Sequence, residues 1–336
     1  MVHRFSSFHA IFAILWLFVA LLPSGCVIQD YGRTLGQSIK GDYYLQTGNH
    51  QGGLTSFREE VRQHPDSAVA RYYYGRFLLQ AGNVREAYDQ LRSAADLAPD
   101  TADYQFWAGL AAGQNGQAKE EQRRYQAALD SDPRHLSALT YLGHSRLAAN
   151  RYQEALDLYA RALQIWPASP AALYNRALIL NRLGRSAEEK IAWLTYMAYH
   201  PSGAKARQAT DYLNALDDFT YRNHRLGART VTIESISFVP FRAEPHPDSH
   251  ESLRLIGTIA RNHPEATLQI LVFLKNNKDL AHHRALAIKR FLLDNTDGLT
   301  ARRIGVSWFG QAQTLSVGQK KRRLDESVDF FLTEGS

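Results

Sequence analysis

GRFLLQAGNVREAYDQLRSAADLAP, residues 75–99, is the stretch that decides the fold, because its pattern recurs along the chain every 34 residues. The period is marked by prolines at positions 65, 99, 133, 167 and 201. Small residues recur in register, namely Gly41, Gly75, Gly109, Gly143 and Ala177. Seven residues later come residue types that tolerate the left-handed conformation at a helix end, namely Gly48, Gly82, Gly116, Asn150 and Gly184. Each unit is therefore predicted to be helix, turn, helix.

Each unit also carries one large residue suited to packing its second helix on its first, namely Phe57, Leu91, Tyr125, Tyr159 and Trp193. This pattern resembles the tetratricopeptide repeat, a 34-residue helical hairpin. The resemblance implies an all-α superhelix of about five repeats over residues 34–203, with a capping helix and linker over 204–227. In the first unit Gly52 and Gly53 weaken helix propensity by about 1 kcal/mol each, so that unit is expected to be frayed or capping.

The first helix of each repeat lines the concave face of such a stack. By helical spacing, the groove positions of the family fall on Tyr72, Arg76, Phe106, Thr140, His144, Tyr174, Asn181 and Arg182. Aromatic rings with a few polar groups suit an extended or helical peptide. The alternative is that the rings pack between neighbouring hairpins.

The pattern changes near Gly227. Residues 230–239 alternate and are rich in β-branched types, which predicts a strand, and the apolar run 268–274 predicts a second strand buried on both faces. Helices are expected after each, the second over 279–293, and further strands over 303–309 and 327–332. The order predicts an α+β sandwich over residues 228–336.

This order resembles the C-terminal domain of the OmpA family, which anchors outer membranes to peptidoglycan. Phe238 with Phe241, and Asn277 leading to Arg284, match family motifs. The family clamps diaminopimelate between this arginine and a loop aspartate, and that aspartate is absent here, while Asp325-Glu326 replaces basic residues. The resemblance leaves Asn277 and Arg284 as possible peptidoglycan contacts, and the alternative for Arg284 is a solvated helix residue.

The four cations at 320–323 are expected in a loop, where they would meet anionic lipid headgroups or stay solvated. His246 and His250 have the spacing of a helical metal site, but Pro245 and Pro247 argue against a shared helix face, and His282 and His283 would point apart by about 100° on a helix, so no metal site and no cofactor are predicted. Gly143-His144-Ser145 lacks the second glycine of a hydrolase elbow, and no phosphate loop or zinc motif occurs. The sequence predicts a protein that is not an enzyme.

The N-terminal segment is not part of the predicted folded domains. The apolar run at 11–22 is too short to span about 30 Å of hydrocarbon, so residues 1–25 are predicted to be a signal peptide. The single cysteine, Cys26, follows Ser24-Gly25 and resembles the lipidated cysteine of a bacterial lipobox, with residues 26–33 as linker. The alternative is an ordinary signal peptide and an incidental buried thiol. Lacking an aspartate after Cys26, the lipoprotein is expected at the outer membrane, facing the periplasm.

The formal charge of +6 is too small for this length to hold nucleic acid at physiological salt. Lipoproteins of this outline resemble the repeat-bearing pilotins of type IV and tight-adherence pili. The resemblance implies a scaffold that binds an envelope protein, such as a secretin or pilus component, in the repeat groove. The alternative is a structural tether between outer membrane and peptidoglycan.

Overall fold

A computed structural model describes the backbone of residues 25–334 and the side chains of residues 31–333. The predicted signal peptide therefore lies outside the described residues except for Gly25, and so does the side chain of Cys26. The chain divides into two compact units between Asn150 and Arg151. Each unit is described by itself.

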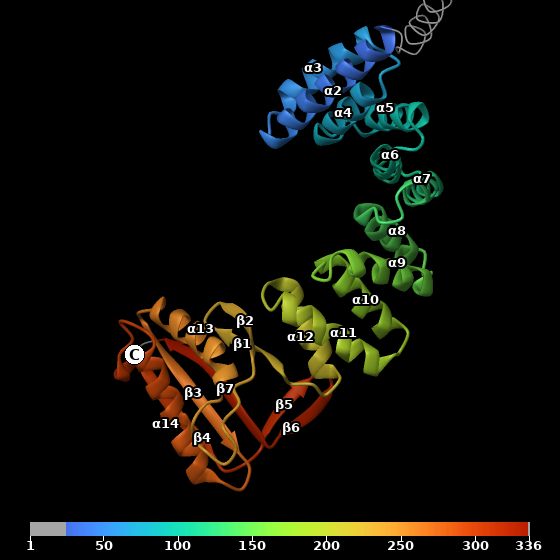
Figure 1. Ribbon diagram of the computed structural model, residues 1–336. Coiled ribbons are helices and arrows are strands. Elements are labelled where there is room, and N and C mark those ends of the chain that lie inside the picture. The colour runs from blue at the N-terminus through green and yellow to red at the C-terminus, as the bar shows by residue number, and fades with distance from the viewer. Residues whose placement is uncertain (1–24, 335–336) are drawn as a thin grey trace, which may run out of the picture. The chain divides into compact units, whose positions relative to one another are not determined.

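The first unit consists of helices that alternate with short turns (Figure 1). They are α2 (Gly25–Gln46), α3 (His50–Gln63), α4 (Ala68–Gln80), α5 (Val84–Leu97), α6 (Ala102–Gln114), α7 (Ala118–Ser131) and α8 (Leu136–Ala148). The first helices of successive hairpins begin at Ala68, Ala102 and Leu136, so the 34-residue period of the sequence is the period of the structure. Helix α2 also covers residues 26–33, where a linker is expected.

The repeated small residues act as predicted. Gly48, Gly82, Gly116 and Gly184 have positive φ, and Asn150 takes the same conformation with φ 58°. A Cβ on Gly75 would lie 2.5 Å from Leu91, and one on Gly109 would lie 2.8 Å from Tyr125. The five large residues of the second helices are all fully buried, namely Phe57, Leu91, Tyr125, Tyr159 and Trp193.

The first repeat is an ordinary helical hairpin rather than a frayed one. Asn49 caps α3, because its side chain accepts a hydrogen bond of 3.0 Å from the backbone N–H of Gly52. Gly53 is required for packing, since a Cβ there would lie 2.5 Å from the ring of Phe77 on the next hairpin. The helix-breaking tendency of the two glycines is thus offset by the cap and by close packing.

The second unit begins with the helices α9 (Tyr152–Ile165), α10 (Pro170–Arg182), α11 (Ser186–Tyr199) and α12 (Ala204–Ala215). Helix α12 is the predicted closing helix, and it buries Ala206, Ala209 and Leu213. Its outer side packs on the strands that follow it, β1 (Tyr221–Leu226), β2 (Arg229–Glu234) and β5 (Gln313–Val317).

The rest of the second unit is an α+β domain, as predicted. It contains α13 (His250–Arg261), β3 (Ala266–Leu274), α14 (Lys278–Asp294), β4 (Ile304–Phe309), β6 (Lys320–Leu324) and β7 (Glu326–Glu334), with short 3-10 turns at Pro247–Ser249 and Ala301–Arg303. The central sheet has the order β4-β3-β7, with β3 parallel to β4 and antiparallel to β7. Strands β1 and β2 form one hairpin, and β5 and β6 form another.

Two expectations about this domain are corrected. Strand β3 is not buried on both faces: Leu268, Ile270 and Val272 are buried, whereas the residues between them are partly exposed. The physical reason is that α13 and α14 supply a single apolar layer that covers one face of the sheet. The basic run at 320–323 is strand β6 rather than a loop, because its backbone pairs with β5 across a turn at Gly318, φ 58°.

Candidate protein-binding site

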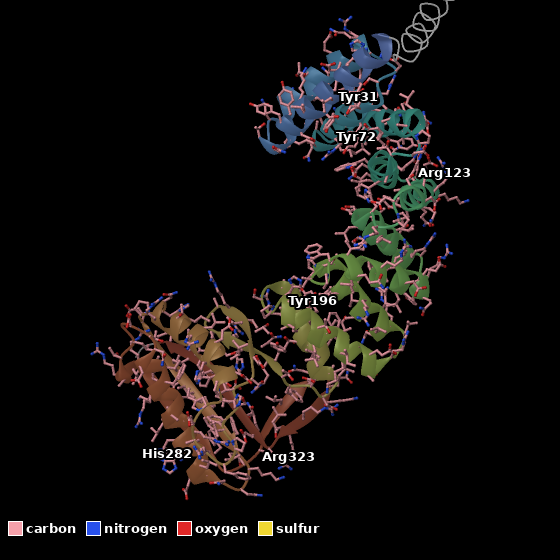
Figure 2. The ribbon with its side chains drawn as sticks, viewed as in Figure 1. Tyr31, Tyr72, Arg123, Tyr196, His282 and Arg323 are labelled. Atoms are coloured by element: carbon pink, nitrogen blue, oxygen red, sulfur yellow. The ribbon has the colours of Figure 1, made fainter. Side chains whose placement is uncertain are left out.

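In the first unit the predicted groove residue Tyr72, labelled in Figure 2, lies beside a second one, Arg76, to which it is hydrogen-bonded. The ring of Tyr72 lies 4.9 Å from that of Tyr73 and 4.7 Å from that of Tyr104. Its hydroxyl accepts a hydrogen bond of 2.8 Å from Nη1 of Arg76. Burial raises the pKa of Tyr72 to about 12, so the hydroxyl stays neutral. The ring itself is core, and only its hydroxyl end approaches a charged group.

Arg76 is the charged group of this cluster. Its guanidinium lies between the ring of Tyr72, at 5.2 Å, and the ring of Trp107, at 4.3 Å. Its Nε is buried and has no hydrogen-bond partner in the structure. A buried guanidinium nitrogen without an acceptor is unfavourable, and stacking of the guanidinium between two rings offsets part of that cost.

The other predicted groove residues of this unit, Phe106, Thr140 and His144, make contacts within the protein. Phe106 is buried, and its ring stacks on Tyr125 at 5.7 Å and lies 5.4 Å from Tyr141. The hydroxyl of Thr140 donates to the carbonyl of Leu136 on its own helix, at 2.9 Å. His144 lies 5.6 Å from the ring of Tyr141. Phe106 therefore packs between hairpins, as the alternative interpretation of the groove rings holds.

In the second unit Tyr174 is also largely packed into the repeats. Its ring lies edge-on to Trp193 at 5.1 Å and to Tyr196 at 5.4 Å. The hydroxyl donates a hydrogen bond of 2.7 Å to Oε1 of Gln208. The Lys205 ammonium lies 4.9 Å from the ring centroid, which is a favourable cation–π distance. Tyr174 thus carries a cation beside it at the edge of the repeats.

Asn181 and Arg182 end the same helix. The side chain of Asn181 donates a hydrogen bond of 2.9 Å to Oε1 of Glu189, and the same oxygen accepts one of 3.1 Å from the indole of Trp193. Asn181 therefore satisfies a buried carboxylate. Arg182 is exposed, and its guanidinium lies 6.0 Å from the ring of Tyr152.

A cavity of about 900 Å³ brings Tyr174 and Arg182 to one place. One wall comes from α10 and α12, and the other comes from β1 and the end of the hairpin β5–β6. Residues that the sequence did not single out complete the lining, namely Leu178, Gln208, Asp211, Tyr212, Asn214, Ala215, Arg222, Asn223, Leu315, Ser316, Val317 and Gly318. Leu315 to Gly318 were missed because the hairpin β5–β6 was not predicted, and Arg222 and Asn223 because β1 was not.

The lining mixes apolar and polar groups. Leu178, Leu315 and Val317 supply apolar surface, and Gln208 and Asn214 supply amide groups. Strand β5 pairs with β6 along one edge only, so its other edge is free of strand partners within the described sheets. A cavity of this size that combines apolar and polar groups suits a peptide segment, and an unpaired strand edge can bind an extended chain.

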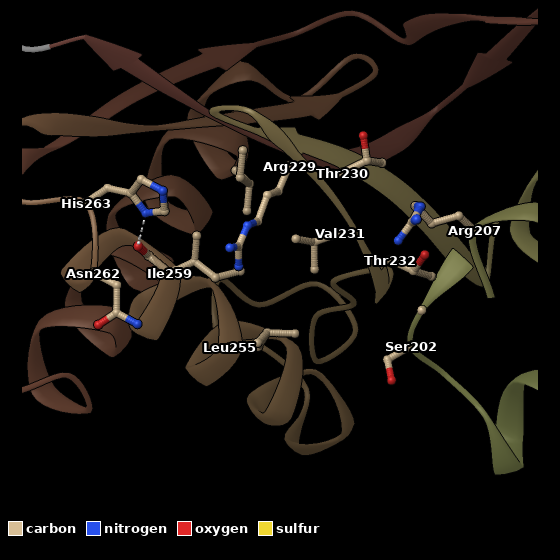
Figure 3. Close-up of a pocket in the computed structure, with 12 residues that line it drawn as sticks. Ser202, Arg207, Arg229, Thr230, Val231, Thr232, Leu255, Ile259, Asn262 and His263 are labelled. Carbon is tan, nitrogen blue, oxygen red and sulfur yellow. Dashed lines mark hydrogen bonds between the residues drawn. The ribbon is translucent and has the colours of Figure 1, made fainter. Parts of the chain in front are cut away.

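A smaller pocket of about 390 Å³ lies between the hairpin β1–β2 and α13 (Figure 3). Its floor is apolar, with Val231, Leu255 and Ile259, and Arg229 reaches into it. The ring of His263 bonds to its own helix, because Nδ1 lies 2.8 Å from the carbonyl oxygen of Ile259. The pocket therefore offers two arginines, Arg207 and Arg229, beside a small apolar surface.

The residues expected to contact peptidoglycan are engaged within the domain. Asn277 caps α14 by accepting a hydrogen bond of 3.0 Å from the N–H of Leu280. Arg284 is buried rather than solvated: it donates from Nε to the carbonyl of Arg242 at 3.0 Å and lies 4.3 Å from the ring of Phe238. Its Nη1 forms an ion pair of 2.9 Å with Glu326. The carboxylate that holds this arginine therefore belongs to the chain itself.

The basic strand β6 is mostly exposed, with Lys320, Lys321 and Arg323 in solvent. Arg322 instead forms an ion pair with Asp217 at the end of α12.

Gly143, His144 and Ser145 lie inside α8, a continuous helix and not a turn. Among the described residues, no group of three metal-ligating side chains forms a site. Within residues 25–334, no helix combines the length and apolarity needed to cross a bilayer.

Comparison with known proteins agrees with the helical hairpins. Residues 40–102, 108–170 and 142–204 match the tetratricopeptide repeat profile. The structure of pilF from Pseudomonas aeruginosa is similar to this chain, with 15% identity and a TM-score of 0.51 over 57% of this chain and 87% of that chain. YrrB, described as a TPR protein with an unusual peptide-binding site, has 16% identity and a TM-score of 0.45 over 51% and 88%. MamA from Desulfovibrio magneticus RS-1 has 14% identity and a TM-score of 0.44 over 49% and 94%.

At such identities the likeness to solved structures concerns the fold alone. The profile match and the observed period together define the nature of the helical region. Residues 40–102 and 108–204 of this chain are tetratricopeptide repeats, the fold of a protein-interaction scaffold.

Proposed function

We propose that this protein is an outer-membrane lipoprotein that holds a segment of a protein partner during assembly of an envelope machine, such as a pilus or secretin complex. The observation that carries the proposal is the cavity of about 900 Å³ next to the last repeat, into which the groove residues Tyr174 and Arg182 and the hairpin β5–β6 converge. If the repeats served only as a spacer between the membrane and the C-terminal domain, these residues would not need to line one cavity.

The lining indicates the chemistry of the partner segment. Arg182 borders the cavity, and Lys205 lies against the ring of Tyr174, which also lines it. The acidic group of the lining, Asp211, accepts a hydrogen bond of 2.9 Å from Asn223. The expected partner segment is extended, carries a carboxylate near Arg182, and places apolar side chains against Leu315 and Val317.

Reversing the charge of Arg182 is expected to weaken partner binding at least tenfold. The reason is that Arg182→Glu places a carboxylate beside the acidic group of the segment. The measurement is the yield of crosslinked envelope protein recovered with the full chain from cells. The matched control is Arg290→Glu, an exposed arginine of α14 outside the cavity, which should keep the yield. Equal loss in both variants would count against a site at this cavity.

The envelope location rests on the junction at residues 22–26. The expected product is a mature chain that begins at Cys26 and carries lipid on its thiol and amino group. Two or more acyl chains contribute about 0.8 kcal/mol per buried methylene, which is enough for stable anchoring. Mass spectrometry of the purified N-terminus measures this directly. An unmodified thiol, or a start at another residue, would refute both lipidation and this mode of anchoring.

The alternative function, a tether to peptidoglycan, has support in the order α13, β3, α14, β4, which matches the OmpA resemblance. The ion pair of Arg284 with Glu326 weighs against it, because the guanidinium that should hold a ligand carboxylate already has one. Lys275 of the loop after β3 likewise pairs with Asp325 at 3.0 Å. Asp325 and Glu326, which replace basic residues of the OmpA family motif, therefore neutralise Lys275 and Arg284 of the chain itself.

The full mature chain is therefore expected not to co-sediment with purified peptidoglycan. Loss of a charge partner typically costs about 2–5 kcal/mol of binding, which corresponds to tens to thousands of times in affinity. An intact family member measured under the same conditions is the positive control. Robust co-sedimentation that free diaminopimelate competes away would restore the anchoring function.

A further inference from the structure

The outward face of helix α2 carries a row of large apolar side chains at intervals of four residues. Tyr31 is 74% exposed, Leu35 51%, Ile39 63% and Tyr43 60%. Residues four apart lie on one face of a helix, so the four side chains form a continuous stripe about 18 Å long. Figure 2 shows Tyr31 on the outside of this helix. We refer to these four residues as the α2 stripe.

The repeat itself shows what the α2 stripe is shaped to contact. One period later, the places of Leu35, Ile39 and Tyr43 are taken by Val69, Tyr73 and Phe77 of α4, which are all buried. They pack on the preceding hairpin, where Tyr73 lies 5.2 Å and Phe77 lies 5.8 Å from the ring of Phe57. The same face of α2 has no hairpin before it within the described residues. Its natural counterpart is therefore another helix.

Two glycines support contact with a helix rather than with a flat surface. Gly32 and Gly36 lie beside the stripe, and a Cβ at either place would meet nothing within 4 Å. Each glycine weakens an exposed helix, and neither is required by packing within the chain. Bare backbone at these two positions lets a second helix approach closely.

A lipid surface fits the α2 stripe less well. Helices that lie in a membrane interface carry lysine and arginine on their flanks. Lys40, on the flank of α2, is instead held in an ion pair of 2.9 Å with Glu60 of α3. The opposite flank carries Asp42, whose carboxylate accepts a hydrogen bond of 2.7 Å from the hydroxyl of Tyr73.

We propose that the α2 stripe pairs with the α2 stripe of a second copy of this chain in an antiparallel dimer. The spacing is self-complementary, because positions 31, 35, 39 and 43 are symmetric about Gln37. An antiparallel pair places Leu35 against Ile39 of the partner subunit and Tyr31 against Tyr43 of the partner subunit. Rows with a spacing of four interdigitate at a crossing angle of about −50°.

Two further observations favour a second copy over other arrangements. Among the described helices, α2 is the one with four exposed large apolar residues in a row, so its best complement on this molecule is itself. The outer side of α12, at the other end of the repeats, is already covered by β1, β2 and β5. The α2 stripe of one copy therefore cannot stack on the outer side of α12 of another copy, which leaves a pair related by two-fold symmetry.

Disulfide trapping in cells tests this dimer with the full chain. Cys26 is the single cysteine of the sequence, so Gly36→Cys adds one thiol close to the expected two-fold axis. Under mild oxidation Gly36→Cys should form a disulfide-linked dimer, whereas Thr55→Cys, at an exposed position of α3, should not. Equal dimer from both variants, or none from Gly36→Cys, would overturn the proposal.

A second substitution distinguishes a second copy of this chain from a different protein or a membrane surface as the partner of the α2 stripe. Ile39→Glu in the Gly36→Cys background should lower the dimer yield at least tenfold, whereas Leu97→Glu, at an apolar residue of α5 that is 49% exposed, should not. Circular dichroism checks that both variants keep their helices. Trapping of a protein of different mass in place of the dimer would show a heterotypic partner. Stripe-dependent binding to phosphatidylglycerol vesicles without any dimer would show a membrane surface, and either result contradicts the proposal.

Discussion

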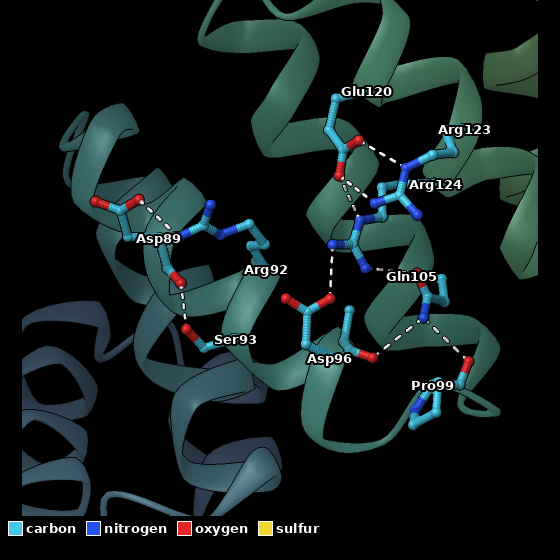
Figure 4. Close-up of polar contacts among 10 residues, drawn as sticks. Asp89, Arg92, Ser93, Asp96, Pro99, Gln105, Glu120, Arg123 and Arg124 are labelled. Atoms are coloured by element: carbon cyan, nitrogen blue, oxygen red, sulfur yellow. Dashed lines mark hydrogen bonds and ion pairs between the residues drawn. The ribbon is translucent and has the colours of Figure 1, made fainter.

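Replacing Arg124 by methionine is expected to lower the free energy of unfolding of the first unit by about 1–3 kcal/mol, the usual cost of leaving a buried polar group without its hydrogen-bond partner. The side chain of Arg124 is 4% exposed and forms ion pairs of 2.7 Å with both Asp96 and Glu120. It also donates a hydrogen bond of 3.0 Å to Gln105, whose amide in turn holds the carbonyls of Ala95 and Pro99 (Figure 4). Its loss leaves the buried amide of Gln105 and the partly buried Glu120 without the guanidinium that joins them, whereas Asp96 is 58% exposed.

Arg123 is a matched control, because it is the next residue and shares the carboxylate of Glu120 at 2.6 Å. Its side chain is 61% exposed, so Arg123→Met should cost less than about 1 kcal/mol. Hydrogen exchange of the full chain measures the stability of this unit separately from the second one. Similar losses for the two variants would show that the network contributes no more than a surface ion pair.

Replacing Asp329 by alanine is expected to destabilise the second unit by about 3–5 kcal/mol, because it leaves a buried cation without its partner. Asp329 on β7 lies 2.8 Å from Nδ1 of the buried His224 and 3.5 Å from Nη2 of Arg222, both on β1. It also accepts a hydrogen bond of 2.9 Å from Gln313 on β5. One carboxylate therefore joins three strands of the domain.

The same carboxylate makes the domain sensitive to acid. Burial by itself raises the pKa of Asp329, but the hydrogen bond from His224 and the charge of Arg222 outweigh it and lower the pKa to about 2. A lowered pKa stabilises the fold above the unfolded value of about 3.9, and this contribution is lost as the pH falls toward about 2. A shift of this size corresponds to about 2–3 kcal/mol.

Urea unfolding of the full chain at pH 7 and at pH 3 measures this contribution. The difference in stability between the two pH values should be smaller in Asp329→Asn than in the native chain. Asp325→Asn serves as control, since Asp325 is 66% exposed and pairs only with Lys275. A pH dependence unchanged in Asp329→Asn would refute the assigned role.

The helical hairpins were predictable because their cause is local and repeated. Prolines after each hairpin and left-handed residues at each turn fix the helix ends independently of distant contacts. The same argument correctly included Asn150, whose φ is 58°. It mistook Gly53 for a weakness, because the residue that needs its missing side chain, Phe77, lies on the next hairpin.

Strand β1 was not predictable from hydrophobic alternation. Its buried positions include Arg222 and His224, polar residues that become buried only because Asp329 satisfies both. The burial of these two polar residues can therefore be predicted only when their partner Asp329, more than a hundred positions away in the sequence, is known. Because β1 pairs with β2, the domain starts at Tyr221 in the structure, ahead of the expected boundary at 228.

The candidate site was predictable only in part for a related reason. The period located Tyr174 and Arg182 on the correct helix, and both line the cavity. It gave no sign of Leu315 and Val317, because strand β5, which precedes the turn at Gly318 and the four cations of β6, was not predicted. Arg284 was expected in solvent as an alternative to ligand contact, and Glu326, distant in sequence, keeps it buried instead.

Photocrosslinking from within the cavity tests the central claim, that the repeats hold a protein partner, most directly. A photoreactive amino acid replaces Val317, which lines the cavity, in the full chain expressed in its own cells. The same residue at Leu97, exposed on α5, is the control. We expect a discrete crosslinked envelope protein from position 317 that Arg182→Glu removes and that position 97 does not give. Irradiation that yields the same products from both positions, or none from position 317, would contradict it.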